Sequence, residues 1–162
     1  MVTVRTGVPD DAPELVRLRQ LMFESMQAGT AAAGDGSAGW REAAEDLLRK
    51  VTADPDSNFG IFVVDDTAHP GRLAACAVGT LEQRLPAPAH PDGLFGFVFN
   101  ICTDPGSRRR GYARACTEAL LDWFDARGAT RIDLHATASG QQLYRQLGFT
   151  EHSVPLSRTR RR

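Results

Sequence analysis

The sequence predicts a single domain of the mixed α/β class. Strand-like and helix-like segments alternate along the chain, as they do in proteins that pack helices against one sheet. The 162 residues suffice for one well-buried core and are too few for two ordinary domains. Because no internal repeat and no long linker divides the chain, residues 1–162 are expected to form one domain, with a basic tail at about residues 158–162.

The first half of the chain is predicted to hold a short strand, two helices and a pair of strands. An aspartate cap and early acidic residues at Pro9-Asp10-Asp11 favour a helix start, and leucine and methionine then recur at helical spacing. Turn residues at Asp66 and Pro70-Gly71 separate two apolar runs. The expected elements are a strand at Val2–Arg5, a helix from Pro9 to about Gln27, a Gly/Ala/Ser-rich loop over Gly29–Gly39, a helix from Trp40 to about Thr52, and strands at Phe59–Asp65 and Arg72–Leu81.

The second half begins with the segment that reads as the most buried strand. Phe95–Thr103 is nearly continuous in bulky apolar residues, which suits a central strand covered on both faces. Turn residues at Asp104-Pro105-Gly106 end it, and an amphipathic helix with Trp123 and Phe124 on its apolar side follows. The remaining expected elements are a helix at Gly111–Arg127, a strand at Arg131–His135, a short helix at Ser139–Leu147, and a tail from Phe149 onward with at most one further strand.

Composition and charge argue against a nucleic-acid or membrane partner. The formal net charge is -1, so no global field attracts a polyanion. The N-terminus lacks the apolar stretch of a signal peptide, and the most apolar run, Leu94 to Cys102, is strand-sized rather than membrane-spanning. The terminal arginines are interpreted as an exposed solubilising tail, with packing against a second subunit as the alternative, so a homodimer stays open.

The three cysteines predict buried thiols rather than a metal site. Cys76, Cys102 and Cys116 are odd in number and widely spaced, and each lies in apolar sequence. No pair has metal-ligand spacing, and none lies beside an evident histidine or aspartate that could activate it. We therefore expect no metal and no catalytic thiol, and a reducing, cytoplasmic location.

The segment from Phe95 to Arg127 predicts an anion site, because a buried strand leads through a short basic turn into a helix. The first amides of a helix have no internal partner, and the helix dipole adds positive potential there. Gly111 lets those amides approach an oxygen closely, and Arg108-Arg109-Arg110 adds charge. No Ser, Thr or Asn stands just before Gly111 as a cap, so a bound phosphate would satisfy the donors.

Two common phosphate-binding motifs fail on this segment. The glycines at Gly106 and Gly111 have the spacing of a Walker A loop, but Tyr112 and Ala113 stand where lysine and serine or threonine would reach the phosphate and the magnesium. The three-glycine fingerprint of dinucleotide-binding folds is also absent. The phosphate ligand is therefore predicted to be neither a nucleoside triphosphate undergoing hydrolysis nor a nicotinamide dinucleotide.

The sequence Arg108-Arg109-Arg110-Gly111-Tyr112-Ala113 closely resembles motif A of the GNAT superfamily of N-acetyltransferases, Arg/Gln-x-x-Gly-x-Gly/Ala. Ile101-Cys102-Thr103-Asp104-Pro105 resembles the strand end that precedes this loop in the family. Leu143-Tyr144-Arg145-Gln146-Leu147-Gly148-Phe149 resembles its Leu-Tyr-x-x-x-Gly-Phe motif. The resemblance covers the C-terminal half, and the N-terminal half matches only in the order of its elements.

The resemblance implies a GNAT-like fold: a central mixed, mostly antiparallel twisted sheet, splayed between the Phe95–Thr103 and Arg131–His135 strands and flanked by about four helices. It also implies acetyl-CoA as the co-substrate. The backbone of the strand end would pair with the pantetheine arm, and the amides of the loop would hold the pyrophosphate. The family often has an asparagine where this chain has Thr137, so that contact falls to Thr137 or Ser139. The implied cofactor-binding residues are Ile101, Cys102, Thr103, Arg108, Arg109, Arg110, Gly111, Tyr112, Ala113, Arg114, Thr137 and Ser139.

For catalysis, the resemblance implies that Tyr144 is the general acid for the departing thiolate. The alternative is a tyrosine that packs the short helix onto the sheet. The base is open, because the Phe95–Thr103 strand carries no carboxylate. Its Asn100 is predicted to satisfy a bulged backbone rather than to take a proton. Glu82 is the preferred base, with His135 or a water relay as alternatives.

These residues lead to one leading hypothesis of function and two alternative hypotheses. The leading hypothesis is an acetyl-CoA-dependent N-acetyltransferase that acts directly on an amine of a small molecule or a peptide. A non-catalytic acyl-CoA-binding sensor or assembly module of the same fold is the first alternative. A nucleic-acid binder that uses the arginine clusters is the second, and the net charge supports it poorly. Helix carboxylates at Glu24, Glu42 and Glu45 would favour a cationic acceptor.

Overall fold

A five-stranded sheet with the spatial order β1-β2-β3-β4-β5 forms the middle layer of the protein. The computed structural model describes residues 2–27, 39–137 and 140–160. Neighbouring strands run antiparallel from β1 to β4, and β5 runs parallel to β4, so the sheet is mixed and mostly antiparallel as expected. The strands are β1 (Arg5–Thr6), β2 (Phe59–Asp65), β3 (Leu73–Gln83), β4 (Leu94–Thr103) and β5 (Arg131–Leu134).

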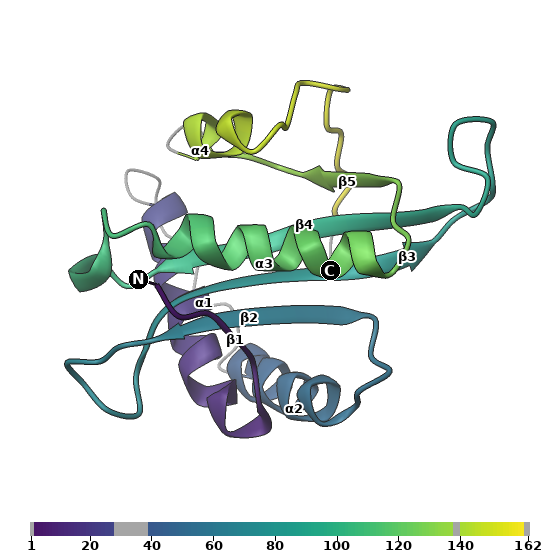
Figure 1. Ribbon diagram of the computed structural model, residues 1–162. Helices are drawn as coiled ribbons and strands as arrows, with labels where there is room; N and C mark the ends of the chain where they lie inside the picture. The colour runs from purple at the N-terminus through teal and green to yellow at the C-terminus, as the bar shows by residue number, and fades with distance from the viewer. Residues whose placement is uncertain (1, 28–38, 138–139, 161–162) are drawn as a thin grey trace.

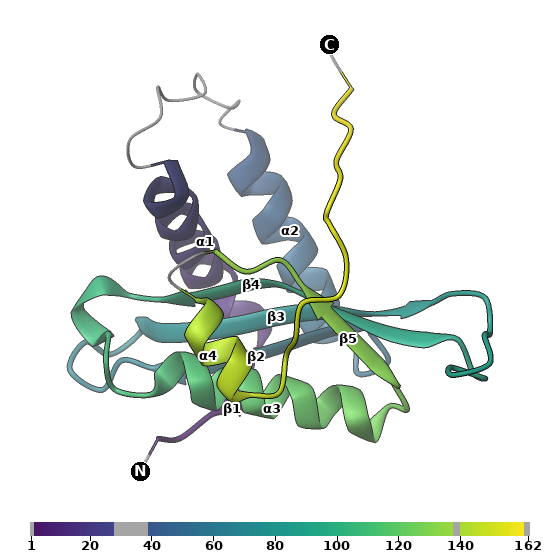
Figure 2. The same cartoon turned by 90° about the horizontal axis from the view of Figure 1, so that it is seen from above.

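Four α-helices within the described residues cover the two faces of this sheet. Figures 1 and 2 show α1 and α2 on one face, and α3 and α4 on the other. Short 3-10 turns, η1 before α1 and η2 between β4 and α3, lead into the helices. No described helix has both the length and the apolar character that a membrane span needs. The helices are α1 (Ala12–Gln27), α2 (Gly39–Ala53), α3 (Tyr112–Ala126) and α4 (Gln141–Gln146), and the turns are η1 (Pro9–Asp11) and η2 (Pro105–Ser107).

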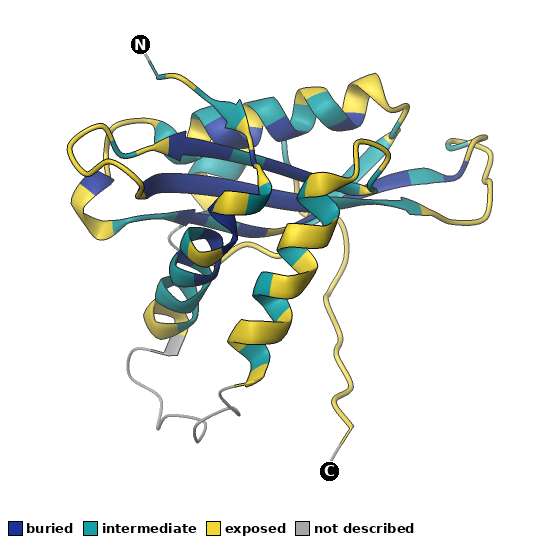
Figure 3. Ribbon diagram, turned by 90° about the horizontal axis from the view of Figure 1, so that it is seen from below, coloured by how far each residue is buried: buried dark blue, intermediate teal, exposed yellow. Residues whose placement is uncertain are grey.

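The core lies on both sides of the sheet. Figure 3 shows the buried residues concentrated along the strands, with exposed residues on the outer sides of the helices. One cluster packs between the sheet and α1, and the other packs between the sheet and α3 around the fully buried Phe124. A Cβ at Gly96 would lie 2.8 Å from the Phe124 ring, so the glycine is what allows α3 to approach β4 this closely. Phe124 is thus a core residue, as expected.

A β-bulge in β4 separates β4 from β5. Val78 of β3 pairs with Asn100 while the next residue, Gly79, pairs with Val98, so Phe99 is an extra residue in β4. β5 pairs with β4 only from Phe95 to Val98. The two strands therefore part where the bulge begins, which confirms the expected splay and gives it a local cause.

Three details differ from the expected elements. The first strand comprises only Arg5–Thr6, because Val2 and Val4 pack against the core on the α3 side instead of continuing the sheet. His135 lies just beyond the end of β5. Residues 149–160 of the tail form no strand. Pro155 cannot donate to a ladder, and the flanking Val154 and Leu156 are more than four-fifths exposed.

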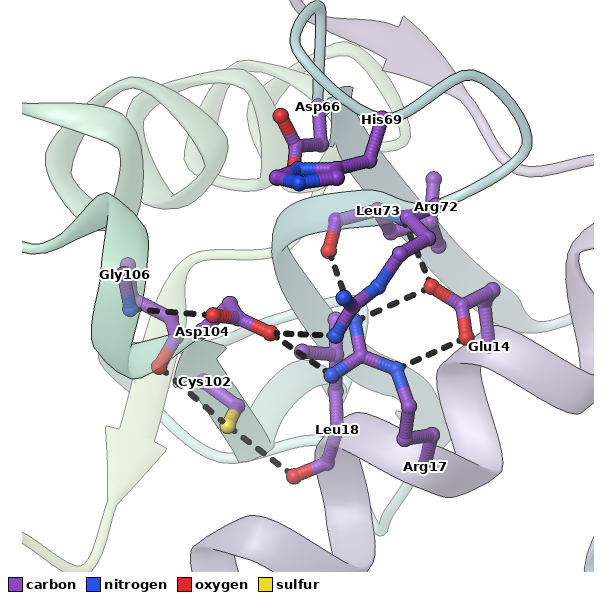
Figure 4. A network of polar contacts seen from close by, with 11 residues as sticks. Glu14, Arg17, Leu18, Asp66, His69, Arg72, Leu73, Cys102, Asp104 and Gly106 are labelled. Atoms are coloured by element: carbon purple, nitrogen blue, oxygen red, sulfur yellow. Dashed lines mark hydrogen bonds and ion pairs between the residues drawn. The ribbon is translucent and has the colours of Figure 1, made fainter.

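An ion-pair network joins α1 to the start of β3 and to the end of β4, which lie side by side because the two strands are antiparallel (Figure 4). The Arg17 guanidinium contacts Asp104, just after β4, at 2.6 Å and Glu14, one turn earlier in α1, at 2.7 Å. Arg17 also donates to the Leu73 carbonyl at the start of β3, and the Leu73 amide donates to Glu14. Asp104 in turn accepts the Gly106 amide at 3.0 Å. The network holds the turn after β4 in a fixed position against α1.

The network depends on the negative charge of the Asp104 carboxylate, so the stability of the fold should depend on pH. Burial alone would raise the pKa of Asp104, but hydrogen bonds from Arg17 and the Gly106 amide outweigh it and hold the pKa below its ordinary value. A depressed carboxyl pKa stabilises the folded state above the unfolded-state pKa, and this contribution is lost as the pH falls through the folded-state pKa.

We predict that Asp104→Asn lowers the free energy of unfolding at pH 7 by about 1–3 kcal/mol, the range for a hydrogen bond to a charged group. The deficit should shrink at about pH 3, below the ordinary carboxyl pKa, because protonation of the unfolded-state carboxyl removes part of the wild-type advantage. Urea unfolding at both pH values measures this. Asp122→Asn, at an exposed carboxylate on α3 that forms no ion pair with a described residue, is the control. Parallel pH profiles for Asp104→Asn and the wild type would contradict the prediction.

Candidate functional site

The turn between β4 and α3 has an unusual backbone. After η2, Arg108 is extended, with φ -68° and ψ 158°. Arg109 has a φ of 63° and is the only non-glycine residue with a positive φ in the described part of the chain. Gly111 follows with a φ of 78° and caps α3 without a side-chain hydrogen bond. Two left-handed residues so close together turn the chain sharply into the helix, and left-handed backbone at a non-glycine residue is often found at ligand sites.

The amides of this turn have no acceptor in the described part of the chain. The first amide of α3 with a backbone partner is that of Ala115, which donates to the Gly111 carbonyl at 3.0 Å. Within the described residues, the amides of residues 108–114 donate to no backbone or side-chain acceptor. The side chains of Arg108, Arg109 and Arg110 are exposed and form no ion pair there. A run of free donors, a helix N-terminus and three cations together favour an anion at this position.

The next side chains of α3 hold the helix in place. Tyr112 is half-buried and packs against the core on the α3 side. The Ala113 carbonyl accepts the Thr117 hydroxyl at 2.7 Å. The Arg114 guanidinium contacts Glu118 on its own helix at 3.0 Å and Gln146 of α4 at 3.2 Å. The backbone amides at these positions remain available to a ligand.

The C-terminal part of β4 has one edge that pairs with no described strand. Ile101, Cys102 and Thr103 pair with β3 on one side, whereas the pairing with β5 on the other side ends at Val98. This edge leads directly to the turn described above. An extended ligand arm could thus add to the sheet here, with its anionic end at the turn.

The cysteines have no features of nucleophiles or metal ligands. The Cys102 thiol donates to the Leu18 carbonyl at 3.0 Å, and burial raises its pKa to about 11. Burial likewise raises the pKa of Cys116 to about 12 and that of Cys76 still further. All three thiols are buried and free, as expected. In the part of the chain that the structure describes, no three histidine, cysteine or carboxylate side chains gather as a metal site.

Tyr144 lies on α4 beside the gap between β4 and β5. Its ring packs against Phe149 with the centroids 6.1 Å apart, and a Cβ at Gly140 would lie 2.9 Å from the ring. Burial raises the pKa of the phenol, so the hydroxyl keeps its proton at neutral pH. That hydroxyl makes no hydrogen bond with any described residue. Tyr144 lines a cavity of about 530 Å³ together with Phe97 and His135.

The two candidate bases lie in different surroundings. Glu82 lies opposite Phe95, near the end of β3, and forms an ion pair with Arg84 at 3.0 Å. It does not line the cavity that contains Tyr144, although Arg84 does. His135 lines this cavity, and its ring meets the Phe97 ring edge-on at 5.4 Å. The structure thus brings His135, rather than Glu82, to the same cavity as Tyr144.

Thr137 follows β5 in the link to α4, and its carbonyl accepts the Gly140 amide at 3.0 Å. Ser139 lies outside the described residues, as does all but Gly39 of the expected loop over Gly29–Gly39. Of the two candidate cofactor contacts, only Thr137 is therefore described.

Sequence reasoning missed one polar group near β4, Arg19 of α1. Its Nη1 donates to the Asn100 Oδ1 atom at 2.8 Å, and its guanidinium lies 4.6 Å from the centre of the Phe23 ring. Asn100 was expected to satisfy the bulged backbone. Its amide group instead donates to the Cys76 sulfur at 3.6 Å, and its oxygen accepts from Arg19. The spacing of Arg19 and Phe23, one helical turn apart, was the available signal.

Comparison with known proteins agrees with this geometry. A model of the acetyltransferase (GNAT) family matches residues 16–149, which is most of the chain and includes β2 to β5 with the turn at Arg108. The chain belongs to the GNAT family. A predicted acetyltransferase from Clostridium acetobutylicum, solved with acetyl-CoA, has the same fold, with a TM-score of 0.78 at 19% identity. That likeness covers 98% of this chain and 96% of the other.

Two curated relatives match shorter stretches of this GNAT protein. A mycothiol acetyltransferase from Beutenbergia cavernae is 37% identical over 67 residues, which are 40% of this chain and 23% of the relative. A [ribosomal protein bS18]-alanine N-acetyltransferase from Salmonella typhimurium is 38% identical over 60 residues, 35% of this chain and 40% of the relative. Each match thus spans less than half of the curated relative.

The turn geometry predicts that Gly111 is essential for anion binding. Gly111→Val should abolish binding of acetyl-CoA, because a branched side chain at a left-handed residue distorts the turn and crowds the free amides. Gly71→Val is a matched control. Gly71 also has a positive φ, and no atom within 4 Å would meet its Cβ, but it lies in the turn between β2 and β3.

Isothermal titration calorimetry with acetyl-CoA, alongside thermal unfolding, checks this prediction. Both variants should lose stability through backbone strain, by about 1–2 kcal/mol. Only Gly111→Val should lose the ligand. Equal loss of binding in both variants would show that reduced stability, rather than the turn, is responsible.

Proposed function

We propose that this GNAT-family protein transfers an acetyl group from acetyl-CoA directly to an amine of a small molecule or a peptide. The observation that carries the proposal is the run of amides at residues 108–114 without protein acceptors, at the end of a strand with an open edge. The names of the two curated relatives and the acetyl-CoA held by the Clostridium protein support it.

In this proposal the turn binds the pyrophosphate. The amides from Arg109 to Arg114 donate to its oxygens, and Arg108 contributes charge nearby. Hydrogen bonds between amides and an anion are stronger than those between neutral groups, and a helix N-terminus favours negative charge. The open edge of β4 at residues 101–103 would pair with the amide groups of the pantetheine arm, with Thr137 or Ser139 as a further contact. The thioester would then lie near the bulge at Phe99.

Tyr144 would protonate the departing thiolate. Its phenol keeps its proton at neutral pH because burial raises its pKa, and its hydroxyl has no competing partner among the described residues. A group that gives a proton only as the bond to sulfur breaks acts in the transition state, which is where catalysis requires it.

The proposal has two candidates for the general base, Glu82 and His135. Glu82 is a carboxylate held by Arg84, and it would act through water because it does not line the cavity around Tyr144. His135 lines that cavity and could take the proton from the acceptor amine directly. Glu82→Gln and His135→Gln separate the two, because only loss of the true base should remove the acidic limb of the pH–rate profile.

Two measurements test the function itself. Acetyl-CoA should raise the melting temperature by binding to the folded state, and ATP with magnesium should do so much less. With a panel of amines, a thiol-release assay should show turnover. Binding without turnover on any amine would favour the non-catalytic acyl-CoA module instead. No binding at near-millimolar ligand would contradict the proposal as a whole.

We predict that Tyr144→Phe reduces turnover by about ten- to a thousandfold, part of the range for a general acid. The ring and its contact with Phe149 remain, so the melting temperature and the affinity for coenzyme A should change little. Steady-state kinetics, calorimetry and thermal unfolding measure the three quantities. Wild-type turnover in the variant would mean that Tyr144 serves packing and that solvent protonates the thiolate. A large loss of stability would instead identify a structural hydroxyl.

A further inference from the structure

Arg19 is the exception among the partly buried arginines of this protein. In the described part of the chain, four arginine residues are neither fully exposed nor fully buried. Three of them pair with carboxylates: Arg5 with Asp11 and Asp65, Arg17 with Glu14 and Asp104, and Arg131 with Asp133. Arg19 pairs with no carboxylate of the described residues. A partly desolvated charge without an opposite charge costs free energy, so its presence calls for an explanation.

The Arg19 guanidinium is held in place, but most of its hydrogen-bond donors have no described partner. Its Nη1 donates to Asn100, which is 3% exposed, and Phe23 lies against the guanidinium. Its Nε and Nη2 make no hydrogen bond with any described residue, although a guanidinium carries five N–H donors. Burial lowers the pKa of Arg19, and the group still remains charged at neutral pH. The donors are therefore fixed, charged and available.

The position of Arg19 is set by the bulge. Asn100, its partner, directly follows Phe99, the extra residue at which β4 leaves β5. Phe99 is 37% exposed and its ring stacks on Phe97, which lines the cavity around Tyr144. The residue that holds the cation thus directly follows a stacked pair of aromatic rings, one of which shares the cavity with Tyr144.

We propose that Arg19 binds an anionic oxygen group of the acceptor, a carboxylate or a phosphate, so that the substrate is a small amine that also carries an anion. This inference rests on the proposed acetyl transfer and narrows its substrate class. An anion at Arg19 would hold the other end of the acceptor near the point where the strands part. A guanidinium recognises both oxyanions well, because its planar donors match two oxygens at once.

Two of the three carboxylates that would favour a purely cationic acceptor, Glu24 and Glu45, are engaged within their own helices. Glu45 forms an ion pair with Arg49 at 2.7 Å, and Glu24 accepts a hydrogen bond from Gln20 at 3.0 Å. They are therefore less available to a ligand than the free donors of Arg19. The amine of the acceptor needs no carboxylate of its own for binding if the anion at the other end supplies the attraction.

The test compares matched acceptors that differ only in the anion. The pairs are phenylalanine with phenylalaninamide, and phosphoethanolamine with ethanolamine, in a thiol-release assay with saturating acetyl-CoA. The wild-type protein should have a higher kcat/KM for at least one anionic member than for its neutral partner, and the two pairs distinguish carboxylate from phosphate. Equal values within both pairs would overturn the inference.

Substitutions of Arg19 then test whether this residue causes the preference for anionic acceptors. Arg19→Gln should lower kcat/KM for the preferred anionic acceptor by about 10- to 100-fold, mainly through KM, since a hydrogen bond to a charged group is lost. The neutral partner and the Kd for acetyl-CoA should change less than about twofold. Arg19→Lys should restore part of the preference. Arg41→Gln, at an exposed arginine on α2 that also lacks a carboxylate partner, should leave the preference intact.

The other outcomes separate the two proposals. If Arg19→Gln slows anionic and neutral acceptors equally, Arg19 acts on the thioester or on the fold, and the inference is wrong. If Arg19→Gln does not fold, the charge-retaining Arg19→Lys and the wild-type preference still decide. Turnover of neutral amines without an anion preference overturns this inference and leaves the acetyl transfer standing. Absence of acetyl-CoA binding overturns both.

Discussion

The extra residue in β4 is the constraint on which the rest of the site depends. Phe99 shifts the pairing with β3 by one position, and β5 cannot follow β4 beyond Val98. A one-residue insertion also changes which face the following side chains occupy. Val98 before it packs with the α3-side core, whereas Asn100 after it contacts Arg19 of α1. One residue therefore opens the strand edge and sets the polar pair between β4 and the middle of α1.

The turn at the far end of β4 is held from both sides of the sheet. On the α3 side, Phe124 packs on Gly96 of β4 and fixes the helix axis against the strand. On the α1 side, Arg17 holds Asp104. The amides of residues 108–114 lie between these two attachments in the chain, so the turn is held in place before any ligand binds. Such pre-organisation lowers the entropic cost of binding.

The sequence predicted the layers of the fold well and the polar contacts poorly. The bounds of β2 agree with the structure, and those of β4 and α3 agree within one or two residues, because long apolar runs and capping glycines specify them locally. The short β1 and the strandless tail depend on what they pack against, which a linear pattern does not contain. The resemblance to the family, rather than periodicity, supplied the splay, because a bulge leaves no clear mark in a continuous apolar run.

In the candidate site, too, local features could be predicted from the sequence and distant contacts could not. The turn at Arg108–Arg114 could be predicted because its residues are adjacent in the sequence. The pair of Arg19 and Asn100 could not, since 81 positions separate the two residues and neither stands out alone. Glu82 looked like a base from its place at a strand end, but only the structure shows that Arg84 holds it and that His135, unlike Glu82, lines the same cavity as Tyr144.

The short β5 also bears on how the protein behaves when it is concentrated. As the last strand of the sheet, it has one edge without a described strand partner, and open edges of this kind promote aggregation. Arg131 and Asp133 alternate along it and pair with each other at 3.0 Å. A second β5 in the antiparallel register would have to desolvate these charges. The strand therefore carries its own protection against edge-to-edge fibre growth, whereas the neighbouring edge of β4 has no charged side chain from Phe99 to Thr103.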